Sequence, residues 1–416
     1  MDKDRKVIRD LAGRYYNYAI SDKNTEKIGL YKAVNDLRMI RPIFLIPFRS
    51  LPLHEMNIDG VLDLKCEDEK ARKIEGWLRY QLFALKHFPC DIYRTPYYPV
   101  YKHCCIGGSY GGLQGIDPQG RHIADAKGAE VGSSEYFDTL QTEEDLDRLH
   151  YLPVSYDREG TMDEFYFAAD ILGDVMPVQV RGHNTLGFAP WDHVSLLRGV
   201  TPLLTDLFDR PEFMHKIARK FTDAFIRTTE EMVKYNLFDA NPPEMHWTPG
   251  FSDDLAPVDD YDSVKPKSVW GRGAAQIFTS VSPAMHDEFD IQYQIEALKD
   301  FDLVYYGCCE RLDDKIEILR KMKNLRKLSI TPWSDINAAC EKIGRDYAMS
   351  VKTNPTNVGE GFDEDVVRNE LKGILDASKR NGCSLSLLLC GTYTVANKPQ
   401  NVIKWAQMAA DAVMNY

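Results

Sequence analysis

A thiol and a carboxylate stand close together in the run Leu303-Val304-Tyr305-Tyr306-Gly307-Cys308-Cys309-Glu310. The first residues of this run are apolar or aromatic, which is typical of a buried strand. Because side chains alternate along a strand, we expect Tyr306, Cys308 and Glu310 on one face. A thiolate and a carboxylate at a strand end suit a borderline-soft ion such as zinc. A register change of one residue would replace Cys308 by Cys309, and the sequence leaves that choice open.

A second thiol ends another apolar run, Leu387-Leu388-Leu389-Cys390, just before Gly391. A lone cysteine in such a place is commonly a core residue. Beside Cys308, however, Cys390 would give a second sulfur at the same end of the sheet. Two cysteines completed by a histidine or carboxylate, with one open position, are the pattern of a catalytic zinc.

The run Glu244-Met245-His246-Trp247 is predicted to be a further strand. Alternation would place Glu244 and His246 on one face, where they suit a metal site or an acid and base. A histidine satisfied by its neighbours in a polar barrel mouth is the structural alternative. The predicted metal ligands are therefore Cys308 and Cys390, with Glu310 or His246 as the completing ligand.

Other polar side chains follow the ends of predicted strands, where parallel barrels gather their functional groups. We predict catalytic roles for Tyr306, Glu244 and His183. We predict substrate-binding roles for Arg49, His54, Asn184, Trp333 and Lys352. The pair Cys104-Cys105 has no such location and is interpreted as packing or loop.

These groups need a scaffold, and the second half of the chain alternates strands with helices. Strands are predicted at 178–180, 244–247, 303–308, 328–331, 347–352 and 385–390, and helices at 287–300, 312–323, 335–344, 362–381 and 398–414. Such alternation indicates parallel βαβ units. Repeated this often, it favours a (β/α)₈ TIM barrel over an open, doubly wound sheet, which is the alternative. No dinucleotide fingerprint or phosphate loop is present.

The first half is less regular. Residues 5–40 predict helices, and 41–47 predict a strand. Asp209 is expected to cap a helix whose buried stripe is Phe213, Ile217, Phe221 and Phe225. Residues 95–165 are irregular and predict an insertion over the barrel mouth, of the kind that acts as a lid. We expect one domain over residues 1–416.

Composition excludes some partners. The chain has 416 residues and a formal net charge of −12, which disfavours nucleic acid and anionic membranes. It contains no apolar run long enough to span a bilayer, and its charged N-terminus lacks the apolar region of a secretory signal. We therefore expect a cytoplasmic protein. Its nine cysteines are expected to be free thiols, ligands or core residues.

Several segments together resemble the uroporphyrinogen decarboxylase superfamily, most closely its corrinoid-dependent methyltransferase branch. The segments are Leu197-Arg198-Gly199 with Asp206 through Glu212, Ser282 through Phe289, Tyr306-Gly307-Cys308-Cys309, and Cys390-Gly391 with Lys398-Pro399-Gln400-Asn401-Val402. The likeness covers residues 175–416 well and the first 170 residues only loosely. It implies a (β/α)₈ barrel, zinc as cofactor, and exchange of a methyl group with a corrinoid held by a partner protein.

The chain departs from both branches of that superfamily. The decarboxylases carry Arg-Gln-Ala-Gly-Arg after the first strand, where this sequence has Phe48-Arg49-Ser50-Leu51-Pro52, so one basic anchor for a polyanionic tetrapyrrole is missing. The methyltransferases carry His-x-Cys, where this sequence has Tyr306 in place of the histidine. Glu310 or His246 would then supply the missing ligand.

Three hypotheses follow. The leading one is a zinc-dependent methyltransferase that moves a methyl group between a small methylated compound and a corrinoid protein, as in the ether demethylation of anaerobic bacteria. The second is a metal-free lyase related to uroporphyrinogen decarboxylase and dependent on Arg49. The third is a non-catalytic barrel that carries a corrinoid or tetrapyrrole. A homodimer is compatible with the resemblance.

Overall fold

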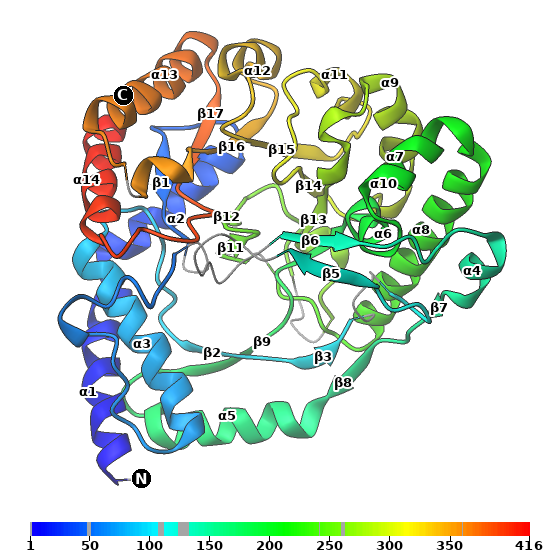
Figure 1. Ribbon diagram of the computed structural model, residues 1–416. Helices are drawn as coiled ribbons and strands as arrows, with labels where there is room; N and C mark the ends of the chain where they lie inside the picture. The colour runs from blue at the N-terminus through cyan, green and yellow to red at the C-terminus, as the bar shows by residue number, and fades with distance from the viewer. Residues whose placement is uncertain are drawn as a thin grey trace.

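The centre of the protein is a parallel sheet of seven strands, in the order β1-β17-β16-β15-β14-β13-β10. The computed structural model describes residues 2–47, 51–106, 112–123, 133–240, 242–258, 263–359 and 361–416. The strands are β1 (Ile43–Leu45), β10 (Thr185–Phe188), β13 (Trp270–Gly273), β14 (Leu303–Tyr306), β15 (Leu325–Ile330), β16 (Ala348–Lys352) and β17 (Ser384–Leu388). They lie along an arc with helices on its outer side (Figure 1), which makes an α/β, barrel-like fold.

The arc is not closed into a barrel by the strands described. β2 (Tyr98–Tyr101) pairs with β9 (Val178–Arg181), and this pair forms a sheet of its own. At the outer edge of β1, Phe44 O accepts a hydrogen bond from Asp91 N at 2.9 Å, and Phe44 N donates to the Asp91 carboxylate at 3.0 Å. The backbone N–H and the side chain of Asp91 therefore satisfy the edge of β1 where a closed barrel would have a neighbouring strand. The predicted closed (β/α)₈ ring is present as an open, barrel-like sheet.

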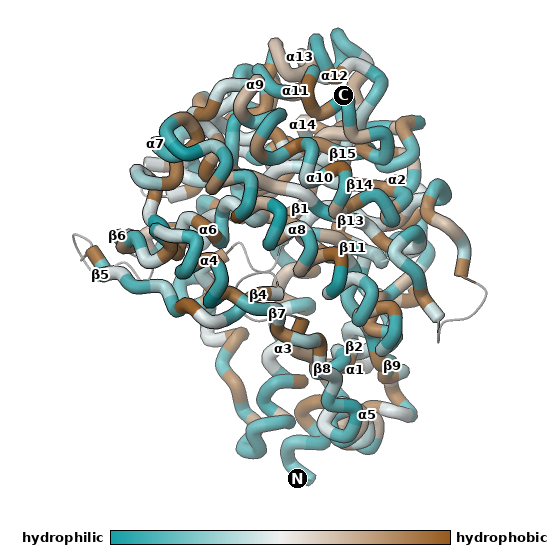
Figure 2. The backbone as a smooth tube through the Cα atoms, turned by 90° about the vertical axis from the view of Figure 1, so that its right-hand side faces the viewer, coloured by the Kyte–Doolittle hydropathy of each residue, from teal (hydrophilic) through white to brown (hydrophobic). Residues whose placement is uncertain are grey.

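Helices lie on the outer side of this sheet and around the β2–β9 pair, which α5 (Arg158–Leu172) contacts. They are α1 (Asp2–Ala19), α2 (Asp22–Asn35), α3 (Glu69–His87), α4 (Glu143–Arg148), α5, α6 (Pro190–Arg198), α7 (Val200–Asp209), α8 (Pro211–Lys234), α9 (Pro283–His286), α10 (Gln292–Ala297), α11 (Ile316–Leu319), α12 (Ile336–Ile343), α13 (Glu364–Asn381) and α14 (Gln400–Met414). A π-helical turn, η5 (Asp287–Ile291), joins α9 to α10. Apolar and polar residues alternate around the turns of these helices (Figure 2), as one-sided burial requires.

The structure contains some of the predicted strands and helices and differs from others. The predicted strands at 303–308, 328–331, 347–352 and 385–390 correspond to β14 to β17, and the stripe from Phe213 to Phe225 on α8 is buried. Asp209 is not the cap of that helix, because α8 begins at Pro211 and Arg210 takes the N-cap position. Within the helix predicted at 312–323, the structure has only the short helix α11. The strand predicted at 244–247 is instead a tight hairpin of β11 (Glu244–Met245) and β12 (Thr248–Pro249).

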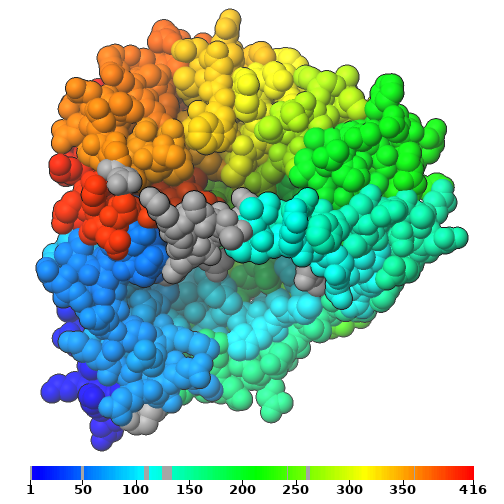
Figure 3. Space-filling model, in the orientation of Figure 1, coloured from blue at the N-terminus to red at the C-terminus, as the bar shows by residue number. Residues whose placement is uncertain are grey.

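The irregular segment at 95–165 forms small antiparallel pairs. They are β3 (His103–Cys105) with β8 (Ser155–Asp157), β4 (Leu113–Gln114) with β7 (His150–Tyr151), and β5 (Gly120–Ile123) with β6 (Ser133–Tyr136). β5 and β6 lie in front of the large sheet in Figure 1, and the surface is hollowed below them in Figure 3. A lid function for this segment stays a prediction.

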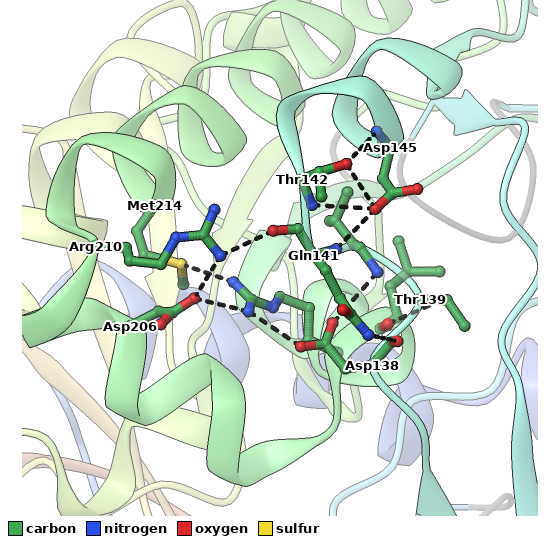
Figure 4. Close-up of polar contacts among 11 residues, drawn as sticks. Asp138, Thr139, Gln141, Thr142, Asp145, Asp206, Arg210 and Met214 are labelled. Atoms are coloured by element: carbon green, nitrogen blue, oxygen red, sulfur yellow. Dashed lines mark hydrogen bonds and ion pairs between the residues drawn. The ribbon is translucent and has the colours of Figure 1, made fainter.

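A buried arginine fastens this segment to the helices. The Arg198 guanidinium, with a side chain 2% exposed, contacts Asp206 at 2.7 Å and Asp138 at 3.2 Å. Arg210 donates to the carbonyl of Gln141 at 2.8 Å and contacts Asp206 at 3.4 Å (Figure 4). Two carboxylates compensate the buried charge of Arg198, and the contacts join residues 138–141 to α6, α7 and α8.

None of the helices in the described parts of the chain is both long and apolar enough to cross a membrane.

Candidate active site at the end of β14

The inner face of the sheet can be assigned from β13 and β14. A Cβ added to Gly271 would meet Phe301, and one added to Gly273 would meet Gln294 of α10, so these two glycines face the helices. Alternation along the strand then turns Arg272 to the inner side. Arg272 is in register with Tyr305 of β14.

Gly307 ends the alternation of β14. Its φ is +102°, which favours glycine, and a Cβ there would lie 2.7 Å from Leu312 Cδ1. The chain turns at this point, so the residues after it do not continue the strand face. Tyr306 and Cys308 were predicted on one face, and the turn at Gly307 makes that prediction wrong.

The backbone of Cys308 is held by neighbouring strands. Its carbonyl accepts a hydrogen bond from Ser329 Oγ at 2.9 Å and another from Lys352 Nζ. Lys352 ends β16, is 5% exposed, and places its Nζ 3.9 Å from Cys308 Sγ. Burial acts to lower the pKa of Lys352, but the acidic groups of Tyr305 and Cys308 outweigh it and raise that pKa. A buried ammonium therefore stands beside the thiol.

Cys308 is the more acidic member of an adjacent thiol pair. Its Sγ lies 3.7 Å from Cys309 Sγ, and a hydrogen bond from Cys309 lowers the pKa of Cys308. Burial opposes this, whereas His246, Lys352 and Arg272 lower the pKa further. Cys309, by contrast, is exposed, and the pKa of its thiol is raised. The structure thus favours Cys308 over Cys309 as the thiolate, a choice that the sequence left open.

His246 reaches this thiolate from the turn of the β11–β12 hairpin. It and Trp247 both have positive φ, 38° and 68°, and their rings stack at 5.0 Å. Burial lowers the pKa of His246, which keeps the imidazole neutral, while its interaction with Cys308 acts in the opposite direction. His246 Nε2 is buried without a hydrogen-bond partner among the described residues. A neutral ring nitrogen with a free lone pair beside a thiolate is a metal-binding arrangement.

Glu310 lies at the same turn but faces the backbone. Its carboxylate accepts hydrogen bonds from Cys308 N at 2.8 Å and from Ala275 N at 3.1 Å, and the residue is 1% exposed. These two contacts hold Cys308 against the loop after β13. The position fits a brace for Cys308 better than a metal ligand, so His246 is the better completing ligand.

Cys390 lies beyond the end of β17 and is 5% exposed. Burial raises the pKa of its thiol to about 11, while Lys352 acts to lower it and Cys308 to raise it. The electrostatic interactions with Lys352 and Cys308 place Cys390 in the same neighbourhood.

The donor chemistry here fits zinc. A thiolate, a neutral imidazole with an unpaired nitrogen, and a second thiol nearby are the ligand types of a catalytic site. Across the described ranges, however, no three His, Cys, Asp or Glu side chains stand close enough together to hold a metal. His246 and Cys308 are in place, and Cys390 is the third donor that would have to approach.

Tyr306 lies on the helix side of β14, away from the thiolate. Its hydroxyl donates to Asp290 Oδ2 at 2.6 Å and lies 2.7 Å from His286 Nε2, and all three residues are fully buried. Burial and the charge of Asp290 raise the pKa of Tyr306 well above its usual value. The predicted catalytic residue is therefore part of a polar network between β14 and the π-helical turn.

His183, Asn184 and Glu244 are separate from Cys308 in their contacts. His183 lies between β9 and β10, where its Nε2 is 2.9 Å from Cys104 Sγ. Asn184 donates to the carbonyl of Glu244 at 2.6 Å and so supports the hairpin that carries His246. Glu244 is exposed at the start of β11, and the hairpin turn removes the predicted shared face with His246.

The remaining substrate-binding predictions lie at the periphery. His54 is exposed, with its Nε2 3.6 Å from the carboxylate of Glu55. Glu55 in turn accepts hydrogen bonds from Val395 N at 2.7 Å and Asn397 N at 2.9 Å, which secures the loop after Cys390. Trp333 is 60% exposed after β15. Arg49 lies outside the described residues.

The sequence reasoning missed Arg272 and Asp192. Arg272 lies in a strand of only four residues, Trp270–Gly273, whose two glycines hide the strand pattern. Asp192 follows β10, which was also not predicted. Burial raises the pKa of Asp192 to about 6, a hydrogen bond from Gln276 opposes the shift, and the charges of Glu310 and Cys308 add to it. A carboxyl group partly protonated near neutral pH thus lies near the thiolate.

The comparisons with known proteins agree with the fold. No protein-family model matches the chain, and no curated protein matches it. Among solved structures, a "methyltransferase from Methanosarcina mazei" is similar over 92% of this chain and 97% of that chain, with a TM-score of 0.50 and 12% sequence identity. This likeness supports a shared barrel-like α/β fold.

Proposed function

We propose that this protein is a methyltransferase that moves a methyl group between a small methylated compound and a corrinoid protein. The observation that carries the proposal is the Cys308 thiolate beside the unpaired Nε2 of His246, at the carboxyl end of a parallel strand. This is where barrel enzymes of the same architecture place their chemistry. The solved structure that shares the fold is described as a methyltransferase, which supports the same reaction class.

Zinc is part of the proposal, with His246 and Cys308 as ligands and Cys390 as the third. When bound, it would supply a Lewis acid for the heteroatom that carries the methyl group. The protein's own side chains have separate tasks. Lys352 balances the charge of the thiolate and holds the Cys308 carbonyl in place. Glu310 braces the Cys308 amide from the other side.

The transfer also requires a proton. The bond between the methyl carbon and its heteroatom breaks, the electron pair stays on the heteroatom, and the methyl group bonds to the reduced corrinoid acceptor. Asp192, with its pKa raised to about 6, is suited to protonate the heteroatom as it leaves.

Methyl transfer to free cob(I)alamin from a panel of methyl ethers, methyl thioethers and methylamines tests the proposal. The loss of the cob(I)alamin absorbance reports the reaction. We expect activity with one of these donors, a loss of at least about a hundredfold in Cys308→Ala and His246→Ala, and near-normal activity in Cys309→Ala. A protein that transfers no methyl group from any of these donors, or is equally active without Cys308, would contradict the proposal. Chelator-insensitive loss of CO₂ from a carboxylated substrate would favour the lyase alternative.

A further inference from the structure

The guanidinium of Arg272 has no acidic partner in the described part of the chain. The residue is partly buried, and its Nε is fully buried without a hydrogen-bond partner. It forms no ion pair with any described residue. A buried cationic nitrogen without a partner is costly unless another molecule supplies the acceptor.

Arg94 and Arg198 also bury an Nε without a hydrogen-bond partner, but their terminal nitrogens bond to protein acceptors, whereas no hydrogen bond or ion pair joins Arg272 to a described residue. Arg198 contacts two aspartates, Arg79 contacts Glu75 at 2.7 Å, and Arg41 contacts Asp91 at 2.8 Å. Each of these structural guanidinium groups therefore has at least one protein acceptor. The unpaired state of Arg272 points to a ligand.

Arg272 lies where a substrate-binding residue would be expected. It faces the inner side of the sheet, and its positive charge acts on Cys308, His246 and Tyr305. On the neighbouring strand it is in register with Gly187, an exposed residue, and a Cβ there would lie 3.4 Å from Arg272 Nη1. The missing side chain at Gly187 leaves the flank of the guanidinium open.

We propose that Arg272 binds an anionic group of the substrate, so that the methyl donor is a small methylated carboxylic acid. Arginine holds a carboxylate through two parallel hydrogen bonds, which fixes the orientation as well as the position of the ligand. Lys352 does not compete for this role, because its ammonium is engaged by Cys308. That this anion is the methyl donor rests on the proposed function, whereas the anion site itself rests on Arg272.

Alkylation of Cys308 by iodoacetate and by its neutral analogue iodoacetamide tests the anion site. The two reagents differ only in the carboxylate, and both form a carbon–sulfur bond with loss of iodide. Because the proposed zinc would protect Cys308, mass spectrometry of the Cys308 peptide gives both rates on protein freed of metal with a chelator, and the exposed Cys105 gives the reference ratio. We expect the iodoacetate-to-iodoacetamide ratio at Cys308 to exceed that at Cys105 by at least about tenfold.

The variants make the test specific to Arg272. Arg272→Met should reduce the ratio at Cys308 to that of Cys105, and Arg272→Lys should retain part of it. Arg219→Met removes the same charge from α8, where Arg219 pairs with Glu296, and should leave the ratio unchanged. An equal ratio at the two cysteines, no effect of Arg272→Met, or no alkylation of Cys308 by either reagent would overturn the inference. None of these readouts depends on methyl transfer, so a failure here is distinct from a failure of the proposed function.

Discussion

Removing the carboxylate of Glu310 should destabilise the protein strongly, although Glu310 forms no ion pair with a described residue. Glu310 is 1% exposed and accepts hydrogen bonds from two backbone N–H groups, those of Ala275 and Cys308. Glu310→Ala leaves both donors buried without an acceptor. At about 1–3 kcal/mol for each unsatisfied buried group, the free energy of unfolding should fall by about 2–6 kcal/mol. Glu310→Gln keeps one carbonyl acceptor and should lose about half as much.

Urea denaturation followed by circular dichroism measures these differences. Glu317→Ala is the matched control, because the Glu317 side chain is 66% exposed in its contact with Arg320 and should change stability by less than about 0.5 kcal/mol. The reasoning also separates a brace from a metal ligand. Glu310→Gln should retain bound zinc, since His246 and Cys308 are unchanged. Glu310→Ala as stable as the control, or Glu310→Gln stable but free of zinc, would refute the account of this residue.

Three further predictions concern other residues. Tyr306→Phe should lower the free energy of unfolding by about 1–3 kcal/mol, because its buried partners lose their hydrogen bonds, yet leave methyl transfer within a few-fold; a stable but inactive variant would restore the catalytic role predicted from sequence. Gly307→Ala should destabilise by about 1–3 kcal/mol in thermal unfolding, because its φ of +102° excludes a side chain; unchanged stability would contradict the tight turn before Cys308. Since burial raises the pKa of Asp192 to about 6 from its usual 3.8, ionisation costs stability as pH rises through 6. Asp192→Asn should therefore raise Tm at pH 8 but not at pH 4, while reducing methyl transfer, and an equal Tm change at both pH values would count against it.

The sequence predicted the scaffold best where strands are apolar and free of glycine. β14 is a continuous apolar and aromatic run, and β16 and β17 are mostly apolar, so the pattern between the helices locates all three. β10 and β13 were missed because each contains glycine, which interrupts the apolar pattern, whereas β14, of the same length, contains none. The closed ring was expected from the number of βα units. At the edge of β1, however, the backbone N–H and side chain of Asp91 make the bonds that a neighbouring strand would make, and nothing local in the sequence indicates this.

The candidate site was predictable only in part. Cys308 and His246 were predicted as ligands from residue type and position, and the fold brings the two side chains together. The faces were wrong, because a strand pattern cannot anticipate the positive φ of Gly307 or the hairpin turn at His246. Arg272 was missed because an unpaired arginine becomes visible only when its surroundings are known.

Anomalous scattering at the zinc edge, measured on crystals of the protein, tests the central claim most directly. The account predicts one peak within bonding distance of His246 Nε2 and Cys308 Sγ, with Cys390 Sγ drawn in as the third ligand. It also predicts that the peak is absent from crystals of Cys308→Ala. No peak at this site in protein purified with zinc present, or a peak whose ligands include neither His246 nor Cys308, would contradict it.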